Sequence, residues 1–144
     1  MSDIGKGYVF EDLKVGMEAS YVRVITDADI RAFAALSGDH NPVHLDEEFA
    51  AKTMFKGRIA HGMLSAGFIS TVIGTQLPGQ GTIYMSQSLN FRAPVRIGDE
   101  VTTVVSVAEL VPEKKRAVLT CRCLVNGKAV LEGEALVKVP SRES

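Results

Sequence analysis

Residues 61–76 read HGMLSAGFISTVIGTQ, and this stretch decides the fold. Apolar residues fall on nearly every side of the helix that the segment predicts, with small residues among them. A helix that is apolar all round is usually a buried one. Pro78-Gly79 then ends it, because proline does not continue a helix. We therefore expect a long, buried helix at the centre of the molecule.

The residues after this helix change to the period of two that is typical of β-strands. One predicted strand begins at Thr82 and places Ile83, Met85, Leu89 and Phe91 on an apolar face. Further strands are predicted near residues 101–107, 117–125 and 129–139, joined by short turns. Asn126-Gly127 is a strong signal for a two-residue hairpin. The central helix should lie against one face of a curved antiparallel sheet, in an α+β fold.

Before the central helix, the chain predicts one strand and one short helix. Residues 15–25 are rich in strand-forming side chains. Thr26 is placed to cap a helix, with Asp29 three residues on in a capping-box arrangement. The apolar stripe of this helix is expected at Ile30, Phe33, Ala34 and Leu36. Ser37-Gly38 should end it, because glycine readily takes the left-handed conformation after a helix.

Composition narrows the class of protein. The 144 residues suit a single domain over 1–144, with its core at about 10–140. A net charge of −1 gives no basic field for nucleic acid, and the apolar runs are too short to span a membrane. Residues 1–7 lack the pattern of a secretory signal. Cys121 and Cys123 should be reduced thiols on one strand face, which favours a cytoplasmic protein.

The chemistry-bearing residues gather in the polar loop 37–46, which reads SGDHNPVHLD. Pro42 favours extended or turned backbone here. Asp39 and His44 are an acid and base pair for proton transfer, provided that Asn41-Pro42 turns the loop back so that both reach one water molecule. Taken singly, Asp39 is equally a loop residue that bonds its own backbone, and His44 a half-buried histidine.

A second candidate follows from the start of the long helix. The first N–H groups of a helix have no partner within it and carry partial positive charge. Gly62 lies at this position and has no side chain to keep a ligand away. Its amide is therefore a candidate donor to an oxygen that gains negative charge during a reaction.

The segment from Gly38 to Asp46, together with the later RIAHGM at residues 58–63, closely resembles the MaoC-like (R)-specific enoyl-CoA hydratases. QSLNF at 87–91 and GDEV at 98–101 are also similar to that family, and the resemblance spans about residues 10–140. It implies a hotdog fold, in which an antiparallel sheet wraps a long central helix. It also implies that Asp39 and His44 activate a water molecule while the Gly62 amide binds the thioester oxygen.

The resemblance extends to further residues with weaker claims. It suggests Ser70 as a donor near the site, although a small packing residue is an equal alternative. Asn41 and Arg58 are expected near the substrate, and either residue can instead shape the loop. His61 is expected to brace the loop or the helix start, and His40 to be solvated. Lys56, Arg58 and Arg92 are candidates to meet carrier phosphates.

The function implied by the resemblance is reversible hydration of trans-2-enoyl thioesters to (R)-3-hydroxyacyl thioesters, in fatty acid metabolism or polyhydroxyalkanoate precursor supply. We expect no metal or redox cofactor, an acyl-CoA or acyl-carrier-protein thioester as substrate, and a homodimer. A thioesterase on the same scaffold and a non-catalytic module that binds acyl chains are the alternatives. In either alternative, Asp39 and His44 would not act together on a water molecule as they do in a hydratase.

Overall fold

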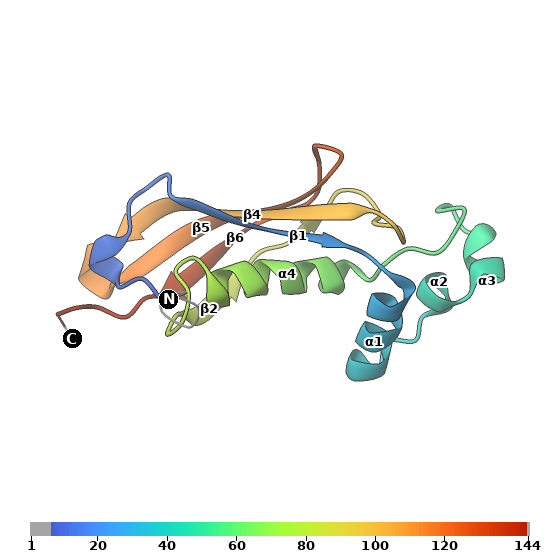
Figure 1. Cartoon of the computed structure of the whole chain (residues 1–144), viewed down its shortest axis with the longest axis horizontal. Helices are drawn as coiled ribbons and strands as arrows, with labels where there is room; N and C mark the ends of the chain where they lie inside the picture. Colours follow the sequence, from blue (N-terminus) through green and yellow to red (C-terminus); the bar gives the residue numbers. More distant parts are fainter. Residues whose placement is uncertain (1–6, 144) are drawn as a thin grey trace.

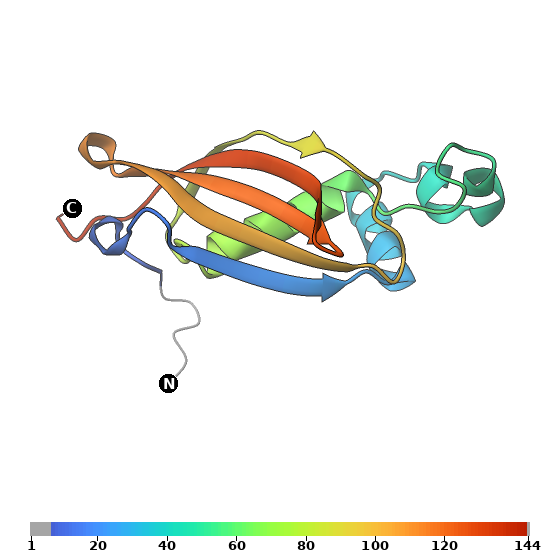
Figure 2. The ribbon, with the colours of Figure 1, turned by 90° about the horizontal axis from the view of Figure 1, so that it is seen from above.

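In a computed structural model that describes residues 7–143, one six-stranded antiparallel sheet covers a long helix, α4 (Gly62–Thr75) (Figures 1 and 2). The expectation for residues 1–6 lies outside the described residues. The other elements are η1 (Phe10–Asp12), β1 (Glu18–Val24), α1 (Asp27–Ser37), α2 (Pro42–Leu45), α3 (Glu47–Ala51), β2 (Ile83–Gln87), β3 (Asn90–Phe91), β4 (Glu100–Val111), η2 (Pro112–Lys114), β5 (Arg116–Val125) and β6 (Lys128–Lys138). The predicted α+β fold, with a sheet over a central helix, is confirmed.

The sheet has the strand order β1-β4-β5-β6-β2, with β3 also paired to β6. Every pairing is antiparallel, which suits strands joined by short turns. Between β5 and β6, Asn126 and Gly127 both have positive φ, at 52° and 78°. These are the left-handed conformations that a tight hairpin turn requires, so the Asn-Gly prediction is confirmed.

The core lies between α4 and the sheet. Phe68, Ile69, Val72 and Ile73 of α4 are buried against inward-facing residues of the strands. The prediction that this helix is buried on all sides is wrong for the described chain. Met63, Gly67, Ser70 and Gly74 form an exposed face, because the sheet covers α4 from one side only.

Strand β2 also differs from its predicted pattern. Ile83, Tyr84 and Met85 are all exposed, where an alternation of buried and exposed residues was expected. The reason is position, because β2 is the last strand of the sheet and pairs only with β6. The helix α4 packs mainly against β1, β4 and β5, so it does not cover the side chains of this edge strand.

The two cysteines behave as expected. Cys121 and Cys123 of β5 are fully buried and unbonded to each other. Burial raises the pKa of the Cys121 thiol to about 11, so the group stays protonated at neutral pH. Among the residues described, no helix has both the length and the apolar character needed to cross a membrane.

Residues 27–60 form a helical arm that projects past one end of the sheet (Figure 1). Its first helix, α1, starts at Thr26, whose side chain accepts a hydrogen bond from Asp29 N at 3.1 Å. Gly38 ends the helix with φ of 84°. The predicted capping box and glycine stop are both confirmed, whereas Leu36, expected in the apolar stripe, is 88% exposed.

Candidate active site

The polar loop folds back on itself through a single helical turn. Pro42 was expected to disfavour helix at Asn41, and Asn41 is non-helical, with φ of −54° and ψ of 124°. Pro42 itself was expected in extended or turned backbone but begins α2 at the first helical position, where its missing N–H costs nothing. Asn41 caps this turn by accepting a hydrogen bond from Val43 N at 3.1 Å. The Asn41 N–H donates to the Asp39 carboxylate at 3.2 Å. This local network brings His44 back towards Asp39.

His44 is held by its ring and is 8% exposed. Its Nδ1 lies 2.8 Å from the carbonyl oxygen of Ile59. Because a carbonyl oxygen only accepts, Nδ1 carries the proton in the neutral ring and Nε2 keeps its lone pair. The ring is therefore fixed in the tautomer in which Nε2 can take a proton from a water molecule.

His61, the residue before α4, packs directly on the first imidazole. The two rings stack with their centroids 3.8 Å apart and an angle of 27° between their planes. His61 Nε2 lies 3.0 Å from the backbone carbonyl of Asp39, so it donates its proton there. The ring of Phe33 from α1 packs on its other side, with centroids 4.7 Å apart. This supports the prediction that His61 braces the loop.

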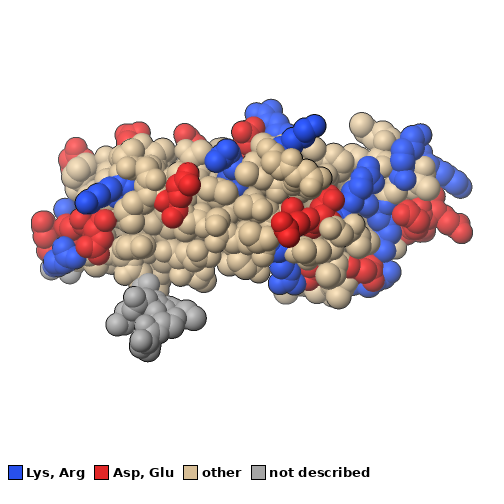
Figure 3. Space-filling model, turned by 45° about the horizontal axis from the view of Figure 1, so that its top comes forward, with Lys and Arg blue, Asp and Glu red and all other residues tan. Residues whose placement is uncertain are grey.

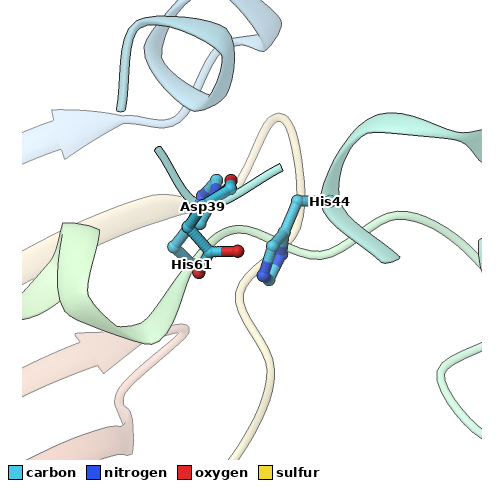
Figure 4. A group of neighbouring side chains, drawn as sticks. All are labelled: Asp39, His44 and His61. Carbon is cyan, nitrogen blue, oxygen red and sulfur yellow. The ribbon is translucent and has the colours of Figure 1, made fainter. Parts of the chain in front are cut away.

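The side chains of Asp39, His44 and His61 meet at this point (Figure 4). A carboxylate oxygen of Asp39 and one ring nitrogen each of His44 and His61 all lie within 4.8 Å of one another. Asp39 is exposed, while both histidines are buried. One water molecule at ordinary hydrogen-bond distances can thus contact Asp39 and His44 together.

The electrostatics of this cluster favour a neutral His44. Burial lowers the pKa of His44 below its ordinary value of 6.5, and the His61 ring lowers it further. The hydrogen bond to Ile59 and the charge of Asp39 act in the opposite direction but do not outweigh burial. At neutral pH the ring is therefore a free base, as abstraction of a proton from water requires.

The same residue types bind metals in other proteins, so the fit of a metal ion can be tested from the geometry. A ring nitrogen binds a metal along its lone pair, in the plane of the imidazole. The planes of His44 and His61 are stacked and nearly parallel, so their lone pairs do not converge on one point between them. The arrangement suits proton transfer better than chelation.

Gly62 begins α4 beside this cluster. Its N–H has no hydrogen-bond acceptor among residues 7–143. The ring of Phe91 packs so closely that a Cβ at Gly62 would lie 2.6 Å from its Cε1. Glycine is therefore required here by close packing, and its amide remains free to donate to an oxygen.

A cavity of about 580 Å³ opens at this helix start. Its wall includes His61, Gly62, Ser65, Phe91 and Val95, and most of its lining is apolar. Asp39 and His44 are not part of that wall, but His61 belongs to both the wall and the cluster. The cavity is therefore adjacent to Asp39 and His44, with the His61 ring and the Gly62 amide at the boundary.

Arg58 serves the loop in this structure. Its Nε donates to the carbonyl oxygen of His44 at 2.6 Å, and its Nη2 donates to the Asp27 carboxylate at 2.6 Å. The Arg58 side chain is largely buried by these contacts. Asn41 likewise caps α2. The predicted substrate contacts of Asn41 and Arg58 stay predictions, since their observed partners shape the loop.

The remaining candidates lie further out. Ser70 is on the exposed face of α4. His40 is exposed to solvent, as expected. Arg92 lines the cavity and pairs with Glu132 at 3.1 Å, while Lys56 is an exposed residue of the arm. Basic and acidic side chains both gather at the arm's end of the molecule (Figure 3).

Sequence reasoning missed four contributors to the site. Asp27 forms an ion pair with Arg58, and Ile59 accepts a hydrogen bond from His44 through its backbone carbonyl. Ser65 contributes a buried hydroxyl, and Phe91 a ring that packs on Gly62. Asp27 and Arg58 are 31 residues apart, so no local pattern links them. Ser65 had a weak signal, because a hydroxyl one turn inside an apolar helix needs a partner.

Known proteins with the same architecture complete this description. The chain is 58% identical to a 3-hydroxybutyryl-CoA dehydratase of Methylorubrum extorquens, over 93% of this chain and 85% of that protein. It is 58% identical to an (R)-specific enoyl-CoA hydratase of Rhodospirillum rubrum, over 94% of both. The solved structure of R-hydratase PhaJ1 from Pseudomonas aeruginosa, unliganded, superposes with a TM-score of 0.89 at 46% identity, over 94% of this chain and 88% of that one.

The family comparison agrees with these individual proteins. The model of the MaoC like domain matches residues 11–126, which contain the polar loop, the start of α4 and most of the sheet. The matched region therefore includes Asp39, His44 and Gly62 together. On this match and these identities, the chain belongs to the MaoC-like family.

Proposed function

We propose that this protein is an (R)-specific enoyl-CoA hydratase, a hydro-lyase that adds water to trans-2-enoyl thioesters and catalyses the reverse dehydration. The observation that carries the proposal is the placement of Asp39 and His44 around one water position beside a free helix N-terminus. The names of the relatives in Methylorubrum extorquens and Rhodospirillum rubrum support the same reaction.

In this mechanism, Asp39 and the Nε2 atom of His44 hold the water and remove a proton from it. The water oxygen bonds to Cβ of the substrate, and the electrons of the double bond move through Cα to the thioester oxygen. The Gly62 N–H stabilises that enolate oxygen. The proton taken from the water then goes to Cα, so one water molecule is added overall. Delivery from one water position gives addition to a single face.

We propose that the reaction uses no resident metal or redox cofactor, because each step is a proton transfer or an oxyanion contact that the chain's own groups supply. Dialysis against a chelator should therefore leave the hydration rate unchanged. A rate that falls on chelation and returns with a divalent metal would contradict this part of the proposal.

The decisive assay is incubation with crotonyl-CoA. Hydration removes the enoyl absorbance without releasing free thiol and yields (R)-3-hydroxybutyryl-CoA. Release of thiol with the alkene intact would instead indicate a thioesterase, and no reaction would favour an acyl-binding module. Asp39→Asn and His44→Ala should each lower kcat by roughly 100- to 10,000-fold while the protein stays folded.

The carrier is proposed to be coenzyme A or an acyl carrier protein, in fatty acid metabolism or in precursor supply for polyhydroxyalkanoates. Arg92 on the cavity wall and the basic residues of the arm support a carrier that bears phosphate. Rates with crotonyl groups on both carriers would decide between them. A cytoplasmic location fits the two buried thiols of β5 and is proposed on that basis.

We also propose a homodimer in which the β2 strands of two copies lie side by side. β2 is an edge strand whose Ile83, Tyr84 and Met85 are exposed, and α4 exposes Met63 beneath the sheet. Light scattering should give twice the chain mass, and Met85→Lys should reduce it. Val15→Lys, a change at an exposed apolar residue outside β2, is the control and should leave the dimer intact.

A further inference from the structure

Two buried polar atoms in the wall residues at the start of α4 have no hydrogen-bond partner among residues 7–143. They are Oγ of Ser65 and Nδ1 of His61, and each residue is only 2% exposed. Both residues belong to the cavity wall, which is otherwise mostly apolar. Buried polar atoms in proteins nearly always have a partner, so this pair marks a place where a polar group binds.

The chemistry of the missing partner follows from the two atoms. His61 Nε2 gives its proton to the Asp39 carbonyl, so Nδ1 holds a lone pair and can only accept. Ser65 Oγ makes no hydrogen bond to any described residue, including the carbonyl oxygen four residues earlier. The hydroxyl of Ser65 can therefore donate. The partner must donate to one atom and accept from the other, as a water molecule does.

The spacing of the two residues suits a single bridging molecule. His61 is the N-cap of α4, and Ser65 is four residues further along. Residues at this spacing on a helix are neighbours, about 5–6 Å apart at their Cβ atoms. Two hydrogen bonds of about 2.8 Å each span a similar distance. One water molecule can bridge two atoms at such a separation, and here it must enter between side chains of the wall, because neither atom is open to solvent in this structure.

The position of this pair along α4 relates it to the substrate. Gly62 and Ser65 are three residues apart and line the same cavity, so they lie on one face of the first turn. A thioester whose oxygen is bound by the Gly62 amide places its acyl group within reach of Ser65. The length of the acyl chain then decides whether it meets the bridging water.

We propose that Ser65 and His61 hold one water molecule in the wall of the acyl cavity, and that this water makes Ser65 a specificity-determining residue that favours short acyl chains. This inference rests on the proposed function, because it takes the cavity as the acyl site. A longer alkyl chain must displace the water and leave both polar atoms buried and unpaired, which binding proteins penalise strongly. A short chain leaves the water in place.

Binding of saturated acyl-CoAs tests this without any turnover. Dissociation constants of butyryl-CoA and octanoyl-CoA are measured for the wild type, for Ser65→Ala, and for the control Thr75→Ala. Thr75 is at the exposed far end of the same helix, away from the cavity. Ser65→Ala should improve octanoyl-CoA relative to butyryl-CoA by roughly 10-fold, because one buried partner of the displaced water is gone. Thr75→Ala should leave the ratio at its wild-type value.

An unchanged ratio in Ser65→Ala overturns the proposal, and so does an equal change for both ligands, which would place the effect on the carrier end. A crystal structure of the wild type gives a second, independent readout and should show a water bonded to Ser65 Oγ and His61 Nδ1. A Ser65 hydroxyl turned to the helix backbone, with no water at His61, overturns it. Absence of crotonyl-CoA hydration would refute the proposed reaction, whereas the wall water is judged by the binding ratio and the crystal structure, neither of which needs turnover.

Discussion

The Arg58 guanidinium ties the carbonyl oxygen of His44 to the carboxylate of Asp27, with both hydrogen bonds at 2.6 Å. One end of this bridge is the turn that carries the His44 imidazole. The other end is the first turn of α1. The orientation of His44 is therefore set by a residue that need not touch the substrate.

We predict that Arg58→Ala lowers kcat much more than it changes KM. The side chain positions His44, and a misplacement of about 1 Å can cost about 100-fold in rate. Arg58→Lys should recover only part of this loss, because lysine lacks the planar fork that makes both bonds. Steady-state kinetics on crotonyl-CoA, with circular dichroism as a check of folding, measure the effect.

Asp27→Asn distinguishes positioning from substrate binding by Arg58. The change weakens the far end of the bridge and leaves Arg58 in place. It should lower kcat in the same direction as Arg58→Ala, and the double variant should be little worse than Arg58→Ala alone. A pure rise in KM for Arg58→Ala, with no effect of Asp27→Asn, would restore the phosphate-binding interpretation.

The pH dependence of kcat/KM for hydration should follow His44. Burial lowers the pKa of this group below 6.5, so the base form is complete at neutral pH. The rate should stay level above pH 6.5 and fall as the pH drops through the lowered pKa. Stability changes in the same direction: the unfolded chain binds the proton more readily, so His44 contributes stability above about pH 6.5 that is lost at lower pH.

A stopped-flow or steady-state pH series at fixed ionic strength measures this profile, with chemical denaturation at each pH for stability. A fall in rate that begins above pH 7 would contradict a lowered pKa for the catalytic base. His44→Ala provides the control, because the remaining slow rate should lose that ionisation.

Gly62→Ala should lower kcat/KM by about 10-fold or more, since its Cβ would lie 2.6 Å from the Phe91 ring, so that the ring or the helix start with the proposed donor must shift. Phe91→Ala in the same chain should recover part of the loss by making room. Gly67→Ala, on the same helix, is the matched control because a Cβ there meets nothing within 4 Å. Equal losses in both alanine variants would show a general helix effect.

Thr26→Ala should destabilise the protein by about 1 kcal/mol, through loss of the side-chain cap of α1. For a chain of this size that corresponds to a fall in Tm of roughly 3 °C. Thr26→Ser keeps the hydroxyl and should retain most of the stability. Thermal unfolding followed by circular dichroism compares the three proteins, and an equal loss in both variants would assign the effect to packing of the methyl group.

The sequence predicts well what depends on near neighbours. Thr26 with Asp29, Gly38, and Asn126 with Gly127 each specify a cap, a stop or a turn within a few residues, and all three occur as expected. The sheet over a central helix follows in the same way, because strand and helix periods are visible along the chain. These features need no knowledge of distant contacts.

The features that the sequence did not predict depend on position in three dimensions. Met85 alternates like a buried strand residue, but it is exposed because β2 is at the edge of the sheet. Pro42 keeps Asn41 out of a helix as expected, but the single helical turn α2 that begins at Pro42 itself was not predicted. The stacking of His61 on His44 joins residues that no local pattern relates. The roles of Asp39, His44 and Gly62 stay predictions that the variants above will test.

The helical arm holds His44 and Asp39, but it lies beyond the sheet and contributes few of the side chains packed around α4. Segments with few core contacts open at lower free energy than the body of a protein. Heating should therefore silence the enzyme before the sheet unfolds, so that residual activity and secondary structure are lost at different temperatures. A bound substrate analogue, by holding the arm against the cavity, should bring the two temperatures together. Selection for heat tolerance in this protein would then act first on residues 27–60, which supply few members of its hydrophobic core.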